Sequence, residues 1–361
     1  PGGEPLLPGA GGPAGDLAAV AMEPAGAALR SVAGELADSL QQLTGPRRAS
    51  YGFAQQRVRS TEVVSSAGLH RTHTSTSALL DLSVREPDGD AAAWTGAAGV
   101  DVAALGLRER HQALTDRLDS ARRKVELPAG RYELLLAPSC VADLMVRFYL
   151  AAGAQDALDG ISVFSSPGGT RLGERLTDLP ITVRSDPAEP GLGCRPFTVV
   201  RSPGSLGSVF DTGVALAPTR WIDNGVLNAL VQTRHSARIC RAPLTPWIGN
   251  LVMDGARGAG SLEDMVRGTR RALLVTCLWY LREVNPAKLM LTGVTRDGVY
   301  LVEDGEVTGT VRDVRLNESP VELLSRITET GRTVPALPRE WTDVPTRVAM
   351  PPVRVSDVAV S

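Results

Sequence analysis

The stretch from Thr292 to Gly309, TGVTRDGVYLVEDGEVTG, constrains the fold most strongly because it predicts a β-hairpin. Residues 299–303 (VYLVE) alternate between two sets of side chains, which is the period-2 pattern of a strand with two different faces. Asp304 and Gly305 follow, and this pair tolerates the positive φ angles that a tight hairpin turn requires. The stretch contains no obvious catalytic residue, so we expect it to act as scaffold for a site formed elsewhere.

The N-terminal part combines helical and strand periodicities. Apolar residues recur every three or four positions over residues 25–43, which predicts an amphipathic helix. Residues 51–85 are rich in Thr, Ser and Val and predict two strands, with turns at Ser66–Gly68 and Pro87–Gly89. The charged segment Leu105–Lys124 predicts a second amphipathic helix.

The following part predicts a strand, an apolar helix and a region of loops. RYELLLAPS (131–139) favours a short strand, and CVADLMVRFYLAAGAQDAL (140–158) favours a largely apolar helix. Gly, Pro, Ser and Asp are dense over residues 165–197, which indicates ordered loops and turns instead of a packed helix.

A long helix is predicted to begin at a capping box formed by Ser261 and Asp264. Its helical spacing of apolar residues continues to Leu281, before Asn285-Pro286 breaks the pattern. A short helix at Pro320–Thr328 and a final strand within MPPVRVSDVAVS complete the chain. Long helices interspersed with hairpins, without βαβ periodicity, indicate an α+β fold with antiparallel or mixed sheets.

The length of 361 residues favours two domains or one large mixed domain. Residues 1–16 are rich in Gly and Pro and are predicted to form a flexible arm. We place the main boundary near Pro128-Ala129-Gly130, between an N-terminal α+β domain (17–127) and a C-terminal α+β domain (128–361).

The charge balance argues against a nucleic-acid partner. The chain has 38 basic and 40 acidic residues and a net charge of −2, without a basic stripe. Its longest apolar run lies within Ala272–Leu281 and is far too short for a membrane span. The first residues lack the basic and apolar regions of a signal peptide, so we expect a cytoplasmic protein.

Motifs for metal or nucleophilic chemistry are largely missing. The four cysteines form no CxxC pair, which excludes a cysteine-based zinc knuckle, and we expect them to be buried free thiols. There is no HExxH; His70 and His73 lie in a predicted strand, where their side chains diverge as exposed histidines, and His111 lies on a solvated helix face. Neither GxSxG, a Walker motif nor GxGxxG is present, so no catalytic residue and no metal ligand are assigned.

One segment with cations offers a binding patch. Arg234 and His235, in LVQTRHSARIC, are placed to contact a carboxylate or a peptide group. The alternative is that they belong to a cluster of cations at the C-terminus of a helix, where positive charge complements the helix dipole.

Several segments together resemble the TldD/PmbA (TldD/TldE) peptidase family, in order from about Arg131 to the C-terminus. They are RYELLLAPSCVADLM, DGISVFSSPGGTRLGERL, GLGCRPFTVV…SVFDTG, LVQTRHSARI, LVTCLWYLREVNP, LTGVTRDGVYLVEDGEV and NESPVELL. The resemblance implies a pair of subunits, of which the TldD-type subunit binds zinc through an HExxxH helix and a cysteine. The corresponding positions in this chain are Met145, Val146 and Leu150, and residues 341–351 contain no cysteine. An apolar helix cannot hold Zn²⁺, so the chain resembles the TldE/PmbA side of the pair.

The resemblance therefore implies a pseudo-enzyme subunit, without a cofactor of its own, that pairs with a zinc-bearing TldD-type paralogue. The heterodimer would hydrolyse small unfolded peptides or peptide-like conjugates, for example in the maturation of a natural-product antibiotic. Exposed amides and a cation at Ser166, Gly168, Gly169 and Arg171 are candidates to face an extended peptide or the partner, alongside Arg234 and His235. The alternative for each is ordinary loop structure or an inter-subunit salt bridge.

Two other functions remain open from the sequence. A stand-alone hydrolase could assemble Ser, His and an acid from distant segments, with His235 as the histidine. A homodimeric binding protein could capture peptides without cleaving them.

Overall fold

The computed structural model describes residues 5, 7, 25–44, 48–86, 92–120, 123–255, 260–342, 345 and 347–361. The predicted flexible arm over residues 1–16, apart from Pro5 and Leu7, and the predicted turn at Pro87–Gly89 lie outside this described part. Within it, no helix has both the length and the apolar character that a membrane crossing would need.

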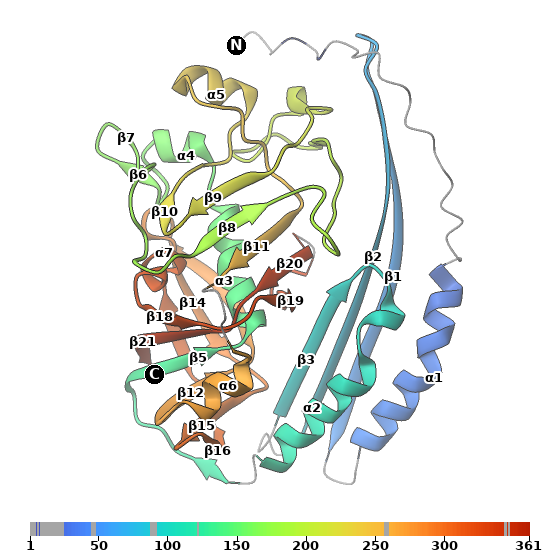
Figure 1. Ribbon diagram of the computed structural model, residues 1–361, viewed down its shortest axis with the longest axis vertical. Coiled ribbons are helices and arrows are strands. Elements are labelled where there is room, and N and C mark those ends of the chain that lie inside the picture. The colour runs from blue at the N-terminus through green and yellow to red at the C-terminus, as the bar shows by residue number, and fades with distance from the viewer. Residues whose placement is uncertain are drawn as a thin grey trace.

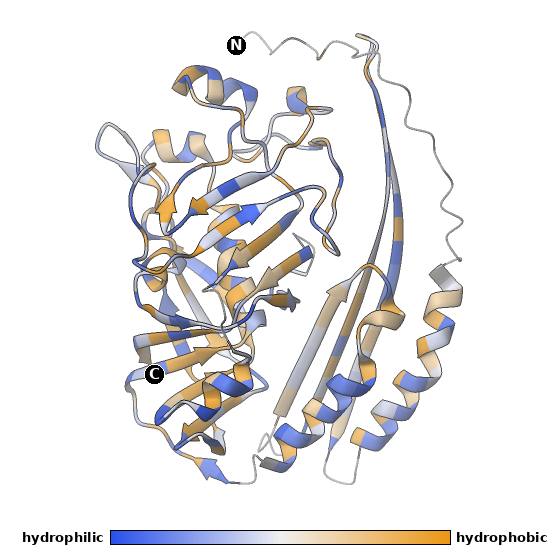
Figure 2. Cartoon of the chain, viewed as in Figure 1, coloured by the Kyte–Doolittle hydropathy of each residue, from blue (hydrophilic) through white to orange (hydrophobic). Residues whose placement is uncertain are grey.

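The N-terminal part is a three-stranded antiparallel sheet with two helices on one face (Figure 1). Its elements are α1 (Ala25–Leu43), β1 (Ala49–Val64), β2 (His70–Arg85), β3 (Ala92–Gly99), the 3₁₀ turn η1 (Val102–Ala104) and α2 (Leu107–Ser120). Leu80, Leu82 and Val84 alternate along β2 and pack with the apolar sides of α1 and α2 in one core cluster. Figure 2 shows the matching polar and apolar stripes on both helices.

Strands β1 and β2 form a long hairpin, as the sequence predicts. All residues from Ala49 to Val64 pair with residues from Arg85 back to His70. The connecting turn is closed by the Ser65 N–H, which donates to the Leu69 carbonyl at 3.0 Å, and Gly68 adopts a φ of +85°.

A ten-stranded mixed sheet forms the base of the C-terminal part, in the order β13-β14-β17-β21-β5-β12-β15-β16-β4 with β18 beside β21. Its strands are β4 (Lys124–Val125), β5 (Gly130–Leu136), β12 (Arg271–Val275), β13 (Leu278–Asn285), β14 (Met290–Thr295), β15 (Val299–Glu303), β16 (Glu306–Val311), β17 (Arg315–Glu318), β18 (Ile327–Thr330) and β21 (Val353–Val360). Strand β5 is parallel to β12 and antiparallel to β21.

The hairpin predicted at the end of the stretch Thr292–Gly309 is confirmed. Strands β15 and β16 are antiparallel, and Asp304 and Gly305 between them have φ angles of 51° and 87°. The two faces of β15 are both buried, but in different clusters. Leu301 belongs to the main core, whereas Tyr300 packs in a smaller cluster with Leu274.

A second, six-stranded sheet has the order β10-β9-β8-β11-β20-β19. Its strands are β8 (Thr182–Ser185), β9 (Thr219–Asp223), β10 (Val226–Leu227), β11 (Asn250–Asp254), β19 (Val334–Ala336) and β20 (Arg347–Met350). Helix α3 (Pro138–Leu150) contacts β5 and β13 of the larger sheet and β19 and β20 of this one, so it lies within the main core.

The remaining described elements are short. They are α4 (Ala154–Leu158), α5 (Arg234–Cys240), α6 (Leu262–Arg267), α7 (Pro320–Leu324), the 3₁₀ turns η2 (Val209–Asp211) and η3 (Pro286–Lys288), and the two-residue strands β6 (Ser165–Ser166) and β7 (Gly169–Thr170). The whole is an α+β fold, as predicted.

The prediction of one long helix from Ser261 to Leu281 is wrong. The capping box of Ser261 and Asp264 is present, but α6 ends at Arg267, and β12 and β13 follow. A continuous apolar run fits a helix and a strand that is buried on both faces equally well. Here Leu273 faces the main core and Leu274 the smaller one, so both faces of β12 need apolar residues. The predicted helix Pro320–Thr328 is likewise only α7, followed by β18.

Candidate functional site

Helix α3 carries the positions that the resemblance aligns with a metal site. The helix follows Ala137, with Pro138 in its first turn. Met145 is 3% exposed and Val146 is fully buried, and both belong to the main core. Leu150, the last residue of the helix, is half-buried and packs against the same core. All three side chains therefore serve packing.

The donor chemistry of α3 does not fit zinc at these positions. Proteins bind zinc through thiolate, imidazole and carboxylate groups, and the aligned thioether and aliphatic side chains supply none of these. Elsewhere in the described part of the chain, no three His, Cys, Asp or Glu side chains lie together so that they could hold a metal ion.

A groove of about 840 Å³ lies between the N-terminal sheet and the C-terminal part. Residues of β3, an edge strand, form one wall, and residues of β19, the edge of the six-stranded sheet, form another. Arg110 Nη1 donates to the Gly96 carbonyl at 2.9 Å, and Arg117 Nη1 donates to the Trp94 carbonyl at 3.1 Å. These bonds from α2 occupy carbonyls of a strand that would otherwise be free to pair with an extended chain.

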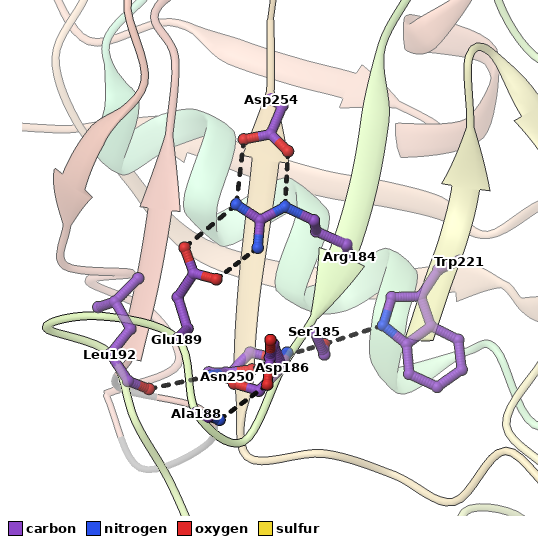
Figure 3. A network of polar contacts seen from close by, with 9 residues as sticks. All are labelled: Arg184, Ser185, Asp186, Ala188, Glu189, Leu192, Trp221, Asn250 and Asp254. Carbon is purple, nitrogen blue, oxygen red and sulfur yellow. Dashed lines mark hydrogen bonds and ion pairs between the residues drawn. The ribbon is translucent and has the colours of Figure 1, made fainter. Parts of the chain in front are cut away.

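A polar network fixes the turn that forms a further wall of the groove (Figure 3). Arg184 on β8 contacts Asp254 at 2.7 Å and Glu189 at 2.5 Å. These two carboxylates hold the pKa of the guanidinium above its usual range. Asn250 on β11 donates to the carbonyls of Asp186 at 2.5 Å and Leu192 at 2.9 Å, so both ends of the turn are anchored to the sheet.

A buried carboxylate joins the N-terminal sheet to the larger C-terminal sheet. Asp297, between β14 and β15, is 3% exposed. Its Oδ1 accepts from Arg85 Nη2 of β2 at 2.7 Å, and its Oδ2 accepts from Arg339 Nη2 at 2.9 Å. The Arg339 guanidinium also lies over the rings of Trp94 and Trp279, 4.8 and 5.0 Å from their centroids. We call Asp297, Arg85 and Arg339 the interlayer cluster.

A second cavity of about 570 Å³ lies beneath the β1–β2 hairpin. It is lined by residues of both strands, by the segment 194–207, and by Leu150, Trp247 and Arg347. We call it the hairpin pocket. Leu150 thus connects it to the helix that the resemblance singles out.

Comparison with known proteins identifies the family. Residues 129–361 match the family described as "PmbA/TldA metallopeptidase C-terminal domain". The chain belongs to this family. A curated relative from Archaeoglobus fulgidus, named "Metalloprotease", is 26% identical over 243 residues, which cover 63% of this chain and 52% of the relative. The PmbA/TldA-family chain therefore spans about half the length of this relative.

Solved structures share the fold of this PmbA/TldA-family chain. TldE from Thermococcus kodakarensis is 18% identical with a TM-score of 0.72, covering 91% of this chain and 73% of its own. A putative modulator of DNA gyrase from Thermotoga maritima is 18% identical with a TM-score of 0.74, covering 91% and 74%. Another from Bacteroides thetaiotaomicron is 16% identical with a TM-score of 0.71, covering 100% and 75%.

The first predicted patch lies on the β6–β7 hairpin of this family member. Ser166 Oγ donates to the Thr170 carbonyl at 3.0 Å, and Gly168 has a φ of +81° in the turn before Gly169. Arg171 makes two bonds of 2.6 Å to the carboxylate of Glu174. The side chains of Ser166 and Arg171 therefore bond within their own loop, and their role toward a peptide or partner stays a prediction.

The second predicted patch lies at the N-terminal end of its helix, whereas the alternative placed it at a C-terminal end. Arg234 and His235 are in the first turn of α5, after the cap residue Thr233, so a C-terminal cation cluster is wrong for them. Positive charge is unfavourable at a helix N-terminus, and buried Asp211 offsets it by accepting from Arg234 Nε at 3.0 Å. His235 is exposed. A role for either residue in binding stays a prediction.

The histidines in the predicted strand region have different surroundings. His70 is exposed and its Nε2 lies 2.8 Å from Glu62, as expected for a surface strand residue. His73 is half-buried instead of exposed, because it lies in the hairpin pocket, where burial and two arginines lower its pKa. His111 is also half-buried, and its Nδ1 lies 2.6 Å from Ser39 Oγ of α1. The expectation of exposure is therefore wrong for His73 and His111.

Three of the four cysteines of this chain are buried free thiols, as predicted, namely Cys140, Cys194 and Cys277. Cys240 is half-buried. Burial raises the pKa of Cys277 to about 12.

Asp143 on α3 gives the family member a pH-sensitive core. Its Oδ1 accepts from the Glu340 N–H at 2.9 Å, whereas Oδ2 is buried without a hydrogen-bond partner. Burial therefore raises the pKa of the carboxyl group well above its usual range. The folded protein holds this proton up to a higher pH than the unfolded chain does. Stability is then fully present below the unfolded pKa of about 3.9 and is lost as the pH rises through the folded pKa.

Replacing Asp143 by Asn is expected to remove this loss, because an amide keeps the acceptor for Glu340 and cannot ionise. Between the two pKa values, wild-type stability should fall relative to Asp143→Asn by about 1.4 kcal/mol per pH unit. Urea unfolding at several pH values from 4 to about 9 measures the difference, with Asp223→Asn, at a partly exposed position, as control. Parallel profiles for wild type and Asp143→Asn would show that Asp143 is ionised in the fold.

Proposed function

We propose that this chain is the metal-free, non-catalytic subunit of a TldD/TldE-type heterodimeric metallopeptidase that hydrolyses small unfolded peptides or peptide-like conjugates. The observation that carries the proposal is the apolar filling of α3, where Met145 and Val146 pack in the core at positions that the resemblance aligns with a histidine and the glutamate of the HExxxH zinc motif. Membership of the PmbA/TldA metallopeptidase family and the fold shared with TldE support it.

In this proposal the zinc and the catalytic residues belong to a TldD-type paralogue. The present chain contributes scaffold that encloses the partner's site, and the β15–β16 hairpin is part of that scaffold. The complex is proposed to act in the cytoplasm, and trimming of a peptide in antibiotic maturation is the proposed context. The β6–β7 loop with Ser166 and Arg171, and the start of α5 with Arg234, are the proposed contacts to peptide or partner.

Co-expression with the zinc-bearing paralogue from the same genome tests the proposal. Native mass spectrometry should show a 1:1 complex, with zinc confined to the partner and peptide hydrolysis only by the mixed complex. Gln in place of the glutamate in the partner's HExxxH motif is the matched control, and it should preserve assembly while abolishing hydrolysis.

Two outcomes would contradict the proposal. A homo-oligomer that ignores the paralogue and binds peptides alone would support the binding-protein alternative. Hydrolysis by the isolated chain that disappears in His235→Ala would support a stand-alone hydrolase.

A further inference from the structure

The hairpin pocket has an unusual charge composition. Among the residues that the structure describes, its lining includes four arginines, Arg59, Arg195, Arg201 and Arg347, and no aspartate or glutamate. Arg184 and Arg339, by contrast, are partly or largely buried and face carboxylates. None of the four pocket arginines forms a salt bridge with a described carboxylate.

Two arginines of the hairpin pocket, Arg195 and Arg347, are held by backbone groups instead of by acids. Arg195 Nε donates to the Phe197 carbonyl at 2.8 Å, and Arg347 Nη2 donates to the Thr76 carbonyl. A guanidinium has five N–H donors, so each retains donors for another partner. Burial lowers the pKa of both groups, and the positive charges of Arg59 and Arg201, which line the same cavity, lower that of Arg195 further.

Buried polar atoms without partners cluster at the same place. Six buried side-chain N or O atoms of the described residues have no hydrogen-bond partner, and three of them belong to residues that line the hairpin pocket. These are His73 Nε2, Thr198 Oγ1 and Trp247 Nε1. The Trp247 indole N–H can only donate, and its ring is fixed by stacking on Tyr149 at 5.8 Å. Buried polar groups normally have partners, so such a cluster indicates a place built for a ligand.

Apolar side chains form a large part of the remaining lining. Leu150, Phe197, Val200, Leu206 and Leu216 contribute to the walls, and Phe197 is 3% exposed. The rim is formed by exposed residues that include Arg59 and Arg201. The volume of about 570 Å³ is in the range of small-molecule sites, which combine apolar walls with a few convergent polar groups.

We propose that the hairpin pocket binds an organic oxyanion, a carboxylate or phosphate carried on an apolar group. Arginine forks match both oxyanions, and the indole N–H and the Thr198 hydroxyl supply neutral donors. Carboxylate-bearing peptides and phosphate compounds share this chemistry. The positive charge of the four arginines disfavours binding of a metal cation. The proposal concerns this chain alone and does not require a partner subunit.

Calorimetry on the isolated full chain tests the proposal with two probes. The first is acetyl-Gly-Gly-Phe with a free C-terminal carboxylate, compared with its C-terminal amide, and the second is inorganic phosphate. If the ligand is a peptide carboxylate, the peptide acid should bind at least about tenfold more tightly than its amide. If the ligand is a phosphate compound, inorganic phosphate should bind and the peptide acid should not. Either pattern supports the pocket, and binding of neither probe overturns it.

Substitutions locate the binding. Arg195→Gln and Arg347→Gln should each lower the affinity for the probe that binds by about tenfold. Trp247→Phe should also lower this affinity, because phenylalanine keeps an aromatic ring but lacks the indole N–H. Arg220→Gln, at an exposed pair on β9, is the matched control and should bind like wild type. Equal affinity in all variants would overturn the proposal.

The thermal stability of the unliganded variants separates this role from a structural one. Because Arg195 is a half-buried cation without a described carboxylate partner, in a pocket that Arg59 and Arg201 also line, Arg195→Gln should raise the melting temperature of the unliganded chain. A structural arginine would lower it when removed. A lower melting temperature combined with unchanged ligand affinity would therefore contradict a ligand site.

Discussion

Replacement of Asp297 by Asn is expected to lower the free energy of unfolding by about 3–5 kcal/mol. Asp297 is nearly fully buried and accepts from Arg85 and Arg339 on opposite sides. Without the carboxylate, the largely buried Arg339 loses the only ion-pair partner that it has among the described residues. Asn tolerates the left-handed backbone of this position, where φ is 56°, so the loss reports on the charge and not on the backbone.

The matched control for this prediction is Asp223→Asn. Asp223 pairs with Arg220 at 3.1 Å, but both side chains are exposed, so we expect a change of at most about 0.5 kcal/mol. Urea unfolding measures both variants, and hydrogen exchange at β3 reports whether the N-terminal sheet separates first. Equal stability of Asp297→Asn and Asp223→Asn would show that the interlayer cluster contributes no net stability.

Local signals in the sequence predict the elements that depend on neighbouring residues. The Asp304-Gly305 turn, the capping box at Ser261 and the helix over residues 25–43 all lie where the sequence places them. The helix prediction failed at residues 268–281 because the structure there depends on tertiary packing and not on neighbouring residues. Whether an apolar run becomes a helix or a doubly buried strand depends on its tertiary neighbours, and β12 pairs on one side with β5, from a distant part of the chain, and on the other with β15.

The candidate sites show the same limit. The family resemblance identifies α3 from one contiguous segment, and its packing is consistent with the apolar sequence. The hairpin pocket draws Arg59, Arg195 and Arg347 from three segments, and the interlayer cluster draws Arg85, Asp297 and Arg339 from three others. A single sequence in which arginine supplies most of the basic residues has no feature that marks these six. Only the tertiary structure shows which of them face carboxylates.

The largest single loss of stability is expected at Val146. Val146→Glu places an ionisable group at a fully buried position of the apolar main core. Burying an unpaired charge is among the few mechanisms that exceed about 4 kcal/mol, so we expect this variant to be unfolded or close to it. Val146→Ala controls for lost volume and should cost about 2 kcal/mol.

Zinc distinguishes a packing position from a hidden metal position. If α3 serves packing alone, added zinc should neither restore nor stabilise the folded state of Val146→Glu, because one carboxylate beside Met145 and Leu150 does not complete a donor set. If further donors lie close by, zinc should bind the new carboxylate and stabilise the folded state, as any ligand specific to the native state does. A rise in melting temperature with zinc in this variant, and none in Val146→Ala, would reveal a latent metal site and would contradict the division of labour proposed for the two subunits.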